Sequence, residues 1–136
     1  IGNVLRLDLL SRYGLCQQLL DEPLAYQLYM VDRTGTLWEN DGAYASCNHG
    51  FASHGGVHVL YRDVLGLRQV DTVNHLVQLR FTDSRLDWCE GRLPTVDGPV
   101  ELRWRKEDGK RVYQVTAPAG YTIKTENRSA LPALQR

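Results

Sequence analysis

The periodicity of the chain changes between FASHGGVHVLYRDVLG at residues 51–66 and VNHLVQLRF at residues 73–81. In the first stretch apolar residues recur at helical spacing, and Gly66 is placed to end the helix. In the second stretch alternate residues form one face of an extended strand: Val73, His75, Val77, Leu79 and Phe81. The sequence therefore predicts helices up to about residue 65 and β-structure from about residue 70.

Four further strand patterns follow, at residues 86–91, 100–105, 112–116 and 121–124. The sequence EDGK at residues 107–110 is typical of a hairpin turn between two antiparallel strands. Five short strands separated by turn residues predict an antiparallel sheet or a β-sandwich. The segment from Ser129 onward has no strand pattern, and we expect it to fray.

The part of the chain before the central loop reads as helical. Residues 3–13 place Leu7 and further apolar residues on one broad face, and this helix should stop near Gly14. Residues 15–21 predict a second short helix, so the two form a helical hairpin. Because proline lacks an N–H group, we expect Pro23 to begin a new helical segment that ends at Gly35.

The composition fits a folded protein of one ordinary domain or two small ones. The chain has 136 residues, of which 43% are hydrophobic and 24% charged, so a packed core is expected. Sixteen basic residues balance sixteen acidic ones, which argues against a nucleic-acid partner. No apolar run approaches the roughly 18 residues of a membrane span. The sequence begins on helical periodicity without an initiator Met or a signal peptide, so we expect it to be part of a longer protein.

The three cysteines carry little information about function or compartment. Cys16, Cys47 and Cys89 form no C-x-x-C pair, and an odd number argues against a disulfide framework. His54 and His58 stand four residues apart, a spacing that can hold zinc, but no H-E-x-x-H motif accompanies them. We therefore predict no metal and no other cofactor.

The loop between the helices and the last helical stretch concentrates the residues that can do chemistry. Trp38 precedes Glu39, and Asn48 precedes His49 in a turn flanked by glycine. Sugar-processing sites need an aromatic face against a pyranose ring and a carboxylate that moves a proton. Each residue also has a structural interpretation: Glu39 as a surface carboxylate, Trp38 as core and His49 as a partner of the loop backbone.

Two other groups of residues contain side chains that could belong to a site. Ser53 does not form a nucleophile elbow, because Phe51 stands two residues before it in place of glycine. Trp88 and Trp104 lie on predicted strands, where they could form a carbohydrate-binding face or belong to the sandwich core.

The runs LRLDLLSRYG, TGTLWEN, SCNHGFASH and VLYRDVLGL together resemble the end of the catalytic domain of bacterial α-L-rhamnosidases, glycoside hydrolase family 78. DSRLDWCEGRLPTVDGPVELRW resembles part of the domain that follows it. The resemblance implies an α+β chain, with the last helices of an (α/α)6 six-hairpin barrel at residues 1–67 and a small antiparallel β-sandwich at residues 68–136. It implies a rhamnose-containing glycoside or polysaccharide as substrate.

The resemblance also assigns roles to residues of the loop. Glu39 matches the family's general base, Trp38 the aromatic beside it, and His49, with Asn48 before it, the histidine that contacts rhamnose. The segment between Glu39 and His49 is shorter than in many members. No segment matches the family's general acid, so the chain alone should be inactive and should pack against a preceding part of the barrel.

The first hypothesis is thus the C-terminal fragment of an inverting α-L-rhamnosidase that carries the general base. The alternative is a non-catalytic module, helical followed by a sandwich, that binds carbohydrate or docks to a partner. A third possibility is another six-hairpin glycosidase with a different sugar, because one fold supports many specificities. The sequence leaves the compartment open between periplasmic, secreted and cytoplasmic.

Overall fold

The computed structural model describes residues 2–35 and 56–136. The chain divides into two compact units, Ile1–Val59 and Leu60–Arg136. The first unit is helical and the second is built mainly from strands, so the α+β class predicted from the periodicity is confirmed. The domain boundary expected after residue 67 stays a prediction.

The first unit contains the expected helical hairpin, formed by α1 (Gly2–Arg12) and α2 (Cys16–Thr34). α1 ends at Arg12, and Gly14 follows it with a φ of 70°, which is accessible to glycine at little cost. The N–H of Leu15 then donates to the carbonyl oxygen of Leu10 at 3.0 Å, the 6→1 bond that closes a Schellman motif. The helix end predicted near Gly14 is confirmed.

α2 is longer than the sequence predicts, because the break expected at Pro23 is wrong. The helix continues through Pro23 and ends at Gly35, whose N–H donates to the carbonyl oxygen of Val31 at 2.7 Å. A proline inside a helix costs about 3 kcal/mol, since it removes one hydrogen bond and crowds the preceding turn. Leu19 and Met30 lie on either side of it and are 3% and 2% exposed. Burial on both sides of Pro23 stabilises one continuous helix.

The core of the helical unit is small. Leu7, Leu10, Leu19 and Val59 are buried together. Several apolar residues that were expected to face inward are more than 40% exposed: Leu5, Leu9, Leu15, Leu28 and Val31. The helical unit therefore leaves much of its apolar surface uncovered within the described residues.

The transition between the two secondary-structure classes occurs where the sequence predicts it. Residues 56–59 are α-helical, and one turn of π-helix, η1 (Leu60–Leu65), follows directly. Gly66 ends this turn with a φ of 97°, and its N–H donates to the carbonyl oxygen of Tyr61 at 3.2 Å. The helix end expected at Gly66 is confirmed, whereas residues 51–55 of the predicted helix lie outside the described residues.

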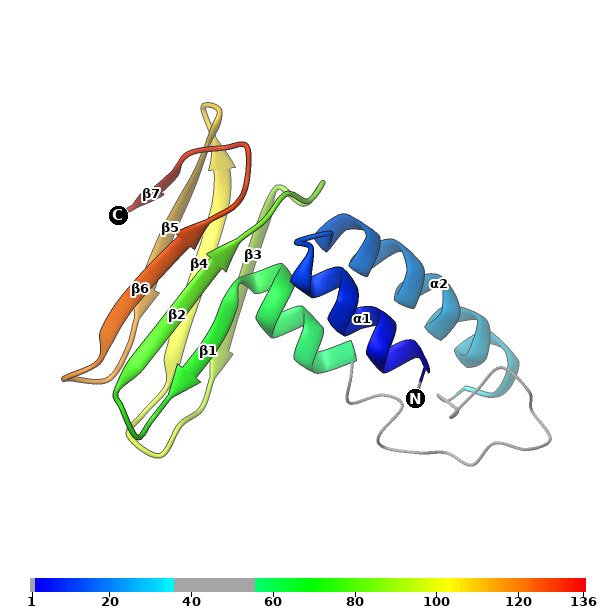
Figure 1. Cartoon of the computed structure of the whole chain (residues 1–136), viewed down its shortest axis with the longest axis horizontal. Helices are drawn as coiled ribbons and strands as arrows, with labels where there is room; N and C mark the ends of the chain where they lie inside the picture. The colour runs from blue at the N-terminus through cyan, green and yellow to red at the C-terminus, as the bar shows by residue number, and fades with distance from the viewer. Residues whose placement is uncertain (1, 36–55) are drawn as a thin grey trace. The chain divides into compact units, whose positions relative to one another are not determined.

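The second unit contains two sheets arranged as two layers (Figure 1). The strands are β1 (Leu67–Asp71), β2 (Leu76–Phe81), β3 (Trp88–Leu93), β4 (Val100–Glu107), β5 (Lys110–Thr116), β6 (Thr122–Asn127) and β7 (Ala133–Gln135). One sheet has the order β1-β2-β6 and the other β3-β4-β5-β7. Most pairings are antiparallel as predicted, but β2 pairs with β6 and β5 with β7 in parallel.

Two strands were missed by the sequence pattern. β1 precedes the predicted start of the β-part, and β7 lies in the tail that was expected to fray, where Leu134 pairs with Val112. Val73 and His75 were assigned to the first strand, but they lie in the turn between β1 and β2 and are exposed. The predicted hairpin turn is confirmed, with Asp108 and Gly109 at φ values of 49° and 71°.

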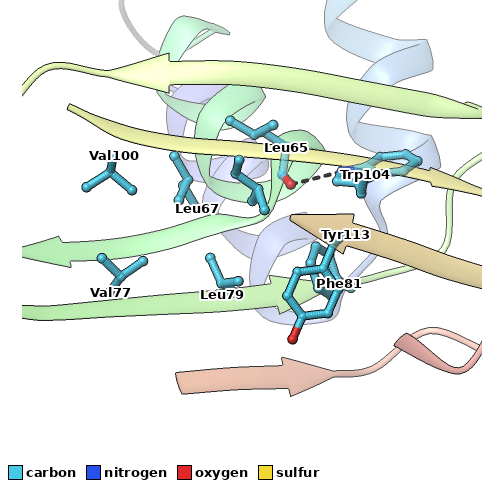
Figure 2. Close-up of a cluster of buried hydrophobic side chains, with 9 residues drawn as sticks. Leu65, Leu67, Val77, Leu79, Phe81, Val100, Trp104 and Tyr113 are labelled. Carbon is cyan, nitrogen blue, oxygen red and sulfur yellow. Dashed lines mark hydrogen bonds between the residues drawn. The ribbon is translucent and has the colours of Figure 1, made fainter. Parts of the chain in front are cut away.

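The core of the sandwich lies between its two sheets and extends to η1 (Figure 2). Val77, Leu79 and Phe81 of β2 are at most 1% exposed, so the predicted inward phase of this strand is confirmed. The indole Nε1–H of Trp104 donates to the carbonyl oxygen of Leu65 at 2.9 Å (Figure 2). This bond ties β4 to the end of η1 inside the core.

A buried arginine completes this core. Arg111 is 1% exposed, and its guanidinium lies over the rings of Phe81 and Trp104, at 5.2 and 4.6 Å from their centroids. It also donates a hydrogen bond to the carbonyl oxygen of Thr82 at 2.8 Å. Two aromatic faces and a carbonyl thus stabilise the charge away from water.

Candidate functional site: the outer face of the four-stranded sheet

The loop residues singled out from the sequence, Trp38, Glu39, Asn48 and His49, lie outside the described residues. Their proposed roles as catalytic base and sugar contacts therefore stay predictions. The other residues that the sequence marks for carbohydrate binding are the two tryptophans of the β-part, and both are described by the structure.

The two tryptophans have opposite environments. Trp104 is 3% exposed and belongs to the core, so the structural interpretation of this residue is confirmed. Trp88 is 64% exposed, at the start of β3. The two tryptophans lie on opposite faces of the sheet. In the register of β3 and β4, Trp104 lies opposite Cys89 and shares its face, whereas Trp88 lies opposite Arg105 on the other face. A joint face formed by both tryptophans is therefore wrong, and Trp88 alone is available to a ligand.

The orientation of β3 is set by its contact with η1. A Cβ atom added at Gly91 would lie 2.6 Å from Cδ2 of Leu65. This position of β3 therefore faces the core and lies close to η1. Cys89 lies two residues before it and faces the same way, opposite Trp104. Because side chains alternate along a strand, Trp88 and Glu90 must face outward.

The outward residues of β3, β4 and β5 form rows across the sheet. One row contains Trp88, Arg105 and Val112, and the next contains Glu90, Arg103 and Gln114. A hollow of about 230 Å³ lies over these two rows, and Arg136 at the chain end also lines it. We call these residues the outer-face hollow.

The polar side chains of the outer-face hollow are held by hydrogen bonds and ion pairs. Arg103 donates its Nε–H to Oε1 of Gln114 at 2.6 Å, and its Nη2 donates to the same oxygen. Glu107 lies 3.1 Å from Nε of Arg105 and 3.4 Å from Nη1 of Arg136. The guanidinium groups therefore have defined positions beside the exposed indole.

The side chains that line the hollow carry more positive than negative charge. Three arginines and Glu90 line it, and Glu107 pairs with two of the arginines from outside the lining. One carboxylate does not supply the pair of carboxyl groups that glycoside hydrolysis needs. An exposed aromatic face next to fixed cationic donors is suited to binding a ligand, since aromatic side chains supply apolar area and arginines supply directed hydrogen bonds.

Other reactive groups among the described residues do not form a second site. Burial raises the pKa of the half-buried Cys89 thiol, which lowers its fraction of reactive thiolate at neutral pH. Within residues 2–35 and 56–136, no three side chains of His, Cys, Asp or Glu are grouped so that they could hold a metal ion. In the same residues, no helix combines the length and apolar character needed to cross a membrane.

The sequence contains a signal for the arginines of the hollow. Arg103 and Arg105 alternate with Leu102 and Trp104 along β4, which places both arginines on the face opposite the core. The sequence does not show that Trp88 lies on the same face as these arginines. That depends on the register between β3 and β4, which the sequence pattern alone does not determine.

The comparisons with known proteins agree with the resemblance noted from the sequence. Residues 75–126 match the family model described as the bacterial alpha-L-rhamnosidase C-terminal domain. The matched segment includes β2 to β5 and all of β6 except its last residue, and thus most of the sandwich. No curated protein and no solved structure matches the chain. The resemblance to the C-terminal part of a bacterial α-L-rhamnosidase is therefore confirmed over residues 75–126.

Proposed function

We propose that this chain is the C-terminal part of a longer bacterial α-L-rhamnosidase and that it carries the general base of an inverting hydrolysis. The observation that carries the proposal is the family match over residues 75–126. That domain follows the catalytic barrel in the enzymes that the sequence resembles. The helical residues before the sandwich would then be the last helices of an (α/α)6 barrel.

In this proposal Glu39 removes a proton from the water molecule that attacks the anomeric carbon of rhamnose. Trp38 stacks on the sugar ring, and Asn48 and His49 hydrogen-bond its hydroxyl groups. An inverting glycosidase needs a second, protonated carboxyl group about 6.5–9.5 Å from the base. That acid would come from the preceding part of the barrel, so the 136-residue chain alone should release no rhamnose.

The exposed surface of the helical unit supports a preceding barrel segment. Leu5, Leu9 and Tyr13 are 64%, 53% and 73% exposed. Leu5 and Leu9 stand four residues apart on α1 and form one apolar stripe, and Tyr13 follows four residues later, directly after the helix. An apolar stripe of this kind marks a contact surface. The neighbouring helices of the barrel would cover it.

The alternative is a non-catalytic module that binds carbohydrate or docks to a partner. The exposed Trp88 and the outer-face hollow favour the carbohydrate-binding form of this alternative. Under this alternative Glu39 would be a loop carboxylate with no role in proton transfer.

The test is the release of the chromophore from an aryl α-L-rhamnoside by the longer protein, with and without Glu39→Gln. We expect the variant to lose about a hundredfold or more in rate, which is the usual size of a general-base contribution. Asp32→Asn, an exposed carboxylate on α2, is the matched control and should retain the parental rate. Circular dichroism should show both variants folded.

Two results would overturn this proposal. Retention of the parental rate by Glu39→Gln would make Glu39 a loop carboxylate and favour the binding module. Absence of rhamnosidase activity in the longer protein would reject rhamnose as the sugar, whatever the fold.

A further inference from the structure

The outer-face hollow combines three features that no hydrolytic role of the chain uses. It contains an exposed indole, a cluster of arginines and a carboxylate, all on the outward side of one rigid sheet. From these features we infer that the outer face of β3, β4 and β5 binds an acidic saccharide, in which a pyranose ring stacks on Trp88 and a sugar carboxylate pairs with Arg103 and Arg105. The choice of a saccharide rests on the proposed function, whereas the charge of the ligand rests on the hollow itself.

Trp88 supplies the stacking surface. It is 64% exposed although it lies in a paired strand, opposite Arg105 of β4. The backbone of Trp88 is fixed by the strand. A ligand that stacks on the indole therefore has few protein degrees of freedom to order. Exposing an indole on a sheet leaves a large apolar area in water, which the flat face of a sugar ring would cover.

The arginines supply complementarity to a carboxylate. A guanidinium has five N–H donors in one plane. Arg103 uses two of its donors in hydrogen bonds to Gln114. The remaining donors of Arg103 are held in a defined orientation by that contact. Arg105 contacts Glu107 through Nε and keeps its terminal N–H groups for a ligand. Arginine binds carboxylates in a bidentate geometry that matches this arrangement.

The position of Glu90 fits a saccharide. Glu90 lies two residues after Trp88 on β3, which places it about 7 Å farther along the strand. A carboxylate at this distance can accept hydrogen bonds from the hydroxyl groups of a sugar whose ring lies on Trp88. A hydroxyl-rich ligand with one carboxylate would therefore satisfy the indole, the arginines and Glu90 together.

A single-stranded nucleic acid would also combine stacking with basic contacts. It is disfavoured here, because such surfaces stack successive bases on several aromatic side chains and follow a positively charged groove. The outer-face hollow has Trp88 as its exposed aromatic, and Glu90 would repel a phosphate backbone. The experiment includes an oligonucleotide so that this outcome is measured.

The experiment is a calorimetric titration of the 136-residue chain with a hexamer of galacturonic acid. Maltohexaose serves as the neutral saccharide and a six-residue oligothymidylate as the nucleic acid. We expect the acidic hexamer to bind at least tenfold more tightly than either. Its affinity should fall as the salt concentration rises, because the arginines are exposed to solvent.

Variants assign the binding to the proposed residues. Trp88→Ala and Arg103→Gln should each weaken binding of the acidic hexamer about tenfold or more, which corresponds to about 1.4 kcal/mol. Trp88→Phe keeps an aromatic face and should retain most of the affinity. Arg128→Gln removes an exposed arginine that lies outside the hollow and pairs with Glu126, so it should change the affinity less than twofold. Unaltered thermal unfolding would show that the variants remain folded.

Several outcomes would overturn the inference. Equal affinity for maltohexaose would reject the acidic class, and tighter binding of the oligothymidylate would reject a saccharide. Binding that survives both Trp88→Ala and Arg103→Gln would place the ligand elsewhere, and no binding at all would reject the site. The titration has no hydrolytic readout, so its failure leaves the Glu39→Gln experiment unaffected. Loss of the rhamnosidase proposal would likewise leave the titration result standing.

Discussion

The connection between η1 and β1 offers a sharp test of the packing described above. Gly66 has a φ of 97°, in the region that side chains of L-residues rarely adopt. Its carbonyl oxygen accepts the N–H of Arg80 at 2.9 Å, so the backbone of β2 passes directly beside it. A Cβ atom added here would lie 2.9 Å from the carbonyl oxygen of Arg80 and 3.1 Å from Cδ1 of Phe81. We therefore expect Gly66→Ala to destabilise the sandwich through two separate effects.

The magnitude follows from these effects. Holding a residue other than glycine at such a φ costs about 1–3 kcal/mol. Overpacking against the backbone of β2 and the buried ring of Phe81 costs about another 1–3 kcal/mol, because neither neighbour can move freely. The expected loss is about 2–6 kcal/mol, a large share of the 5–15 kcal/mol that stabilises an ordinary domain.

A matched variant separates the two contributions. Gly120 has a φ of 85°, and a Cβ atom added there would meet nothing within 4 Å. Gly120→Ala therefore carries only the backbone strain, about 1–3 kcal/mol. The difference between the variants measures the close contact at Gly66.

The assay is amide hydrogen exchange of the β2 backbone, which reports the free energy of opening the sandwich separately from the helical unit. Protection of the β2 amides should fall much further in Gly66→Ala than in Gly120→Ala. If the two variants lost the same protection, the close approach of Gly66 to β2 would be wrong. If Gly66→Ala lost none, the left-handed conformation at this residue would be wrong as well.

Two further predictions concern the hydrogen bonds of each unit. Side-chain hydrogen bonds from Arg6 on α1 and, second, from Gln18 on α2 lower the pKa of Glu22 from 4.5 to about 2. Because the folded pKa is the lower one, the stabilisation is present above about pH 4.5 and is lost as the pH falls toward 2. Acid titration of the helical signal should show this loss, and Glu22→Gln should reduce the pH dependence in that range. A titration unchanged by the substitution would mean that the ion pair does not stabilise the hairpin. Trp104→Phe keeps a six-membered aromatic ring but removes the donor to the carbonyl oxygen of Leu65 and leaves space in the core. The lost hydrogen bond alone should cost about 1–3 kcal/mol in β4 amide exchange. A neutral result would show that this carbonyl has another donor.

The features predicted correctly from the sequence are those that local geometry determines. Gly14, Gly35 and Gly66 all have positive φ values, and each ends a helix where the sequence places an end. The alternation of Val77 and its neighbours along β2 predicts the buried face, because side chains of a strand alternate between the two sides of a sheet. The Asp108–Gly109 turn follows the same rule, since both central residues adopt positive φ values that these residue types tolerate.

The features that were missed depend on contacts between distant parts of the chain. β7 has three residues, and it exists because it pairs in parallel with β5 at the edge of the sheet. No pattern within three residues indicates such a partner. The continuity of α2 through Pro23 likewise depends on buried side chains on both sides of the proline. In both places tertiary packing outweighs the local preference of the sequence.

The loop residues pose a different limit. Trp38 and Glu39 can be chosen from the sequence because an aromatic beside a carboxylate suits sugar chemistry, but this reasoning also permits a surface carboxylate next to a core tryptophan. The specific roles of base and sugar contact come from the resemblance to a family. They depend on the experiment with Glu39→Gln.

The candidate site on the sandwich shows how a core contact determines what the surface presents. A slip of one residue in the pairing of β3 with β4 would exchange the two faces of β3 and would bury Trp88. Such a slip would bring a residue with a side chain to the position of Gly91, where a Cβ atom would lie 2.6 Å from Cδ2 of the buried Leu65, so the leucine would have to move. Gly91 therefore favours the observed register, because it has no side chain at this contact. The exposure of Trp88 beside Arg105 thus follows from the packing of η1 on the opposite side of the same strand.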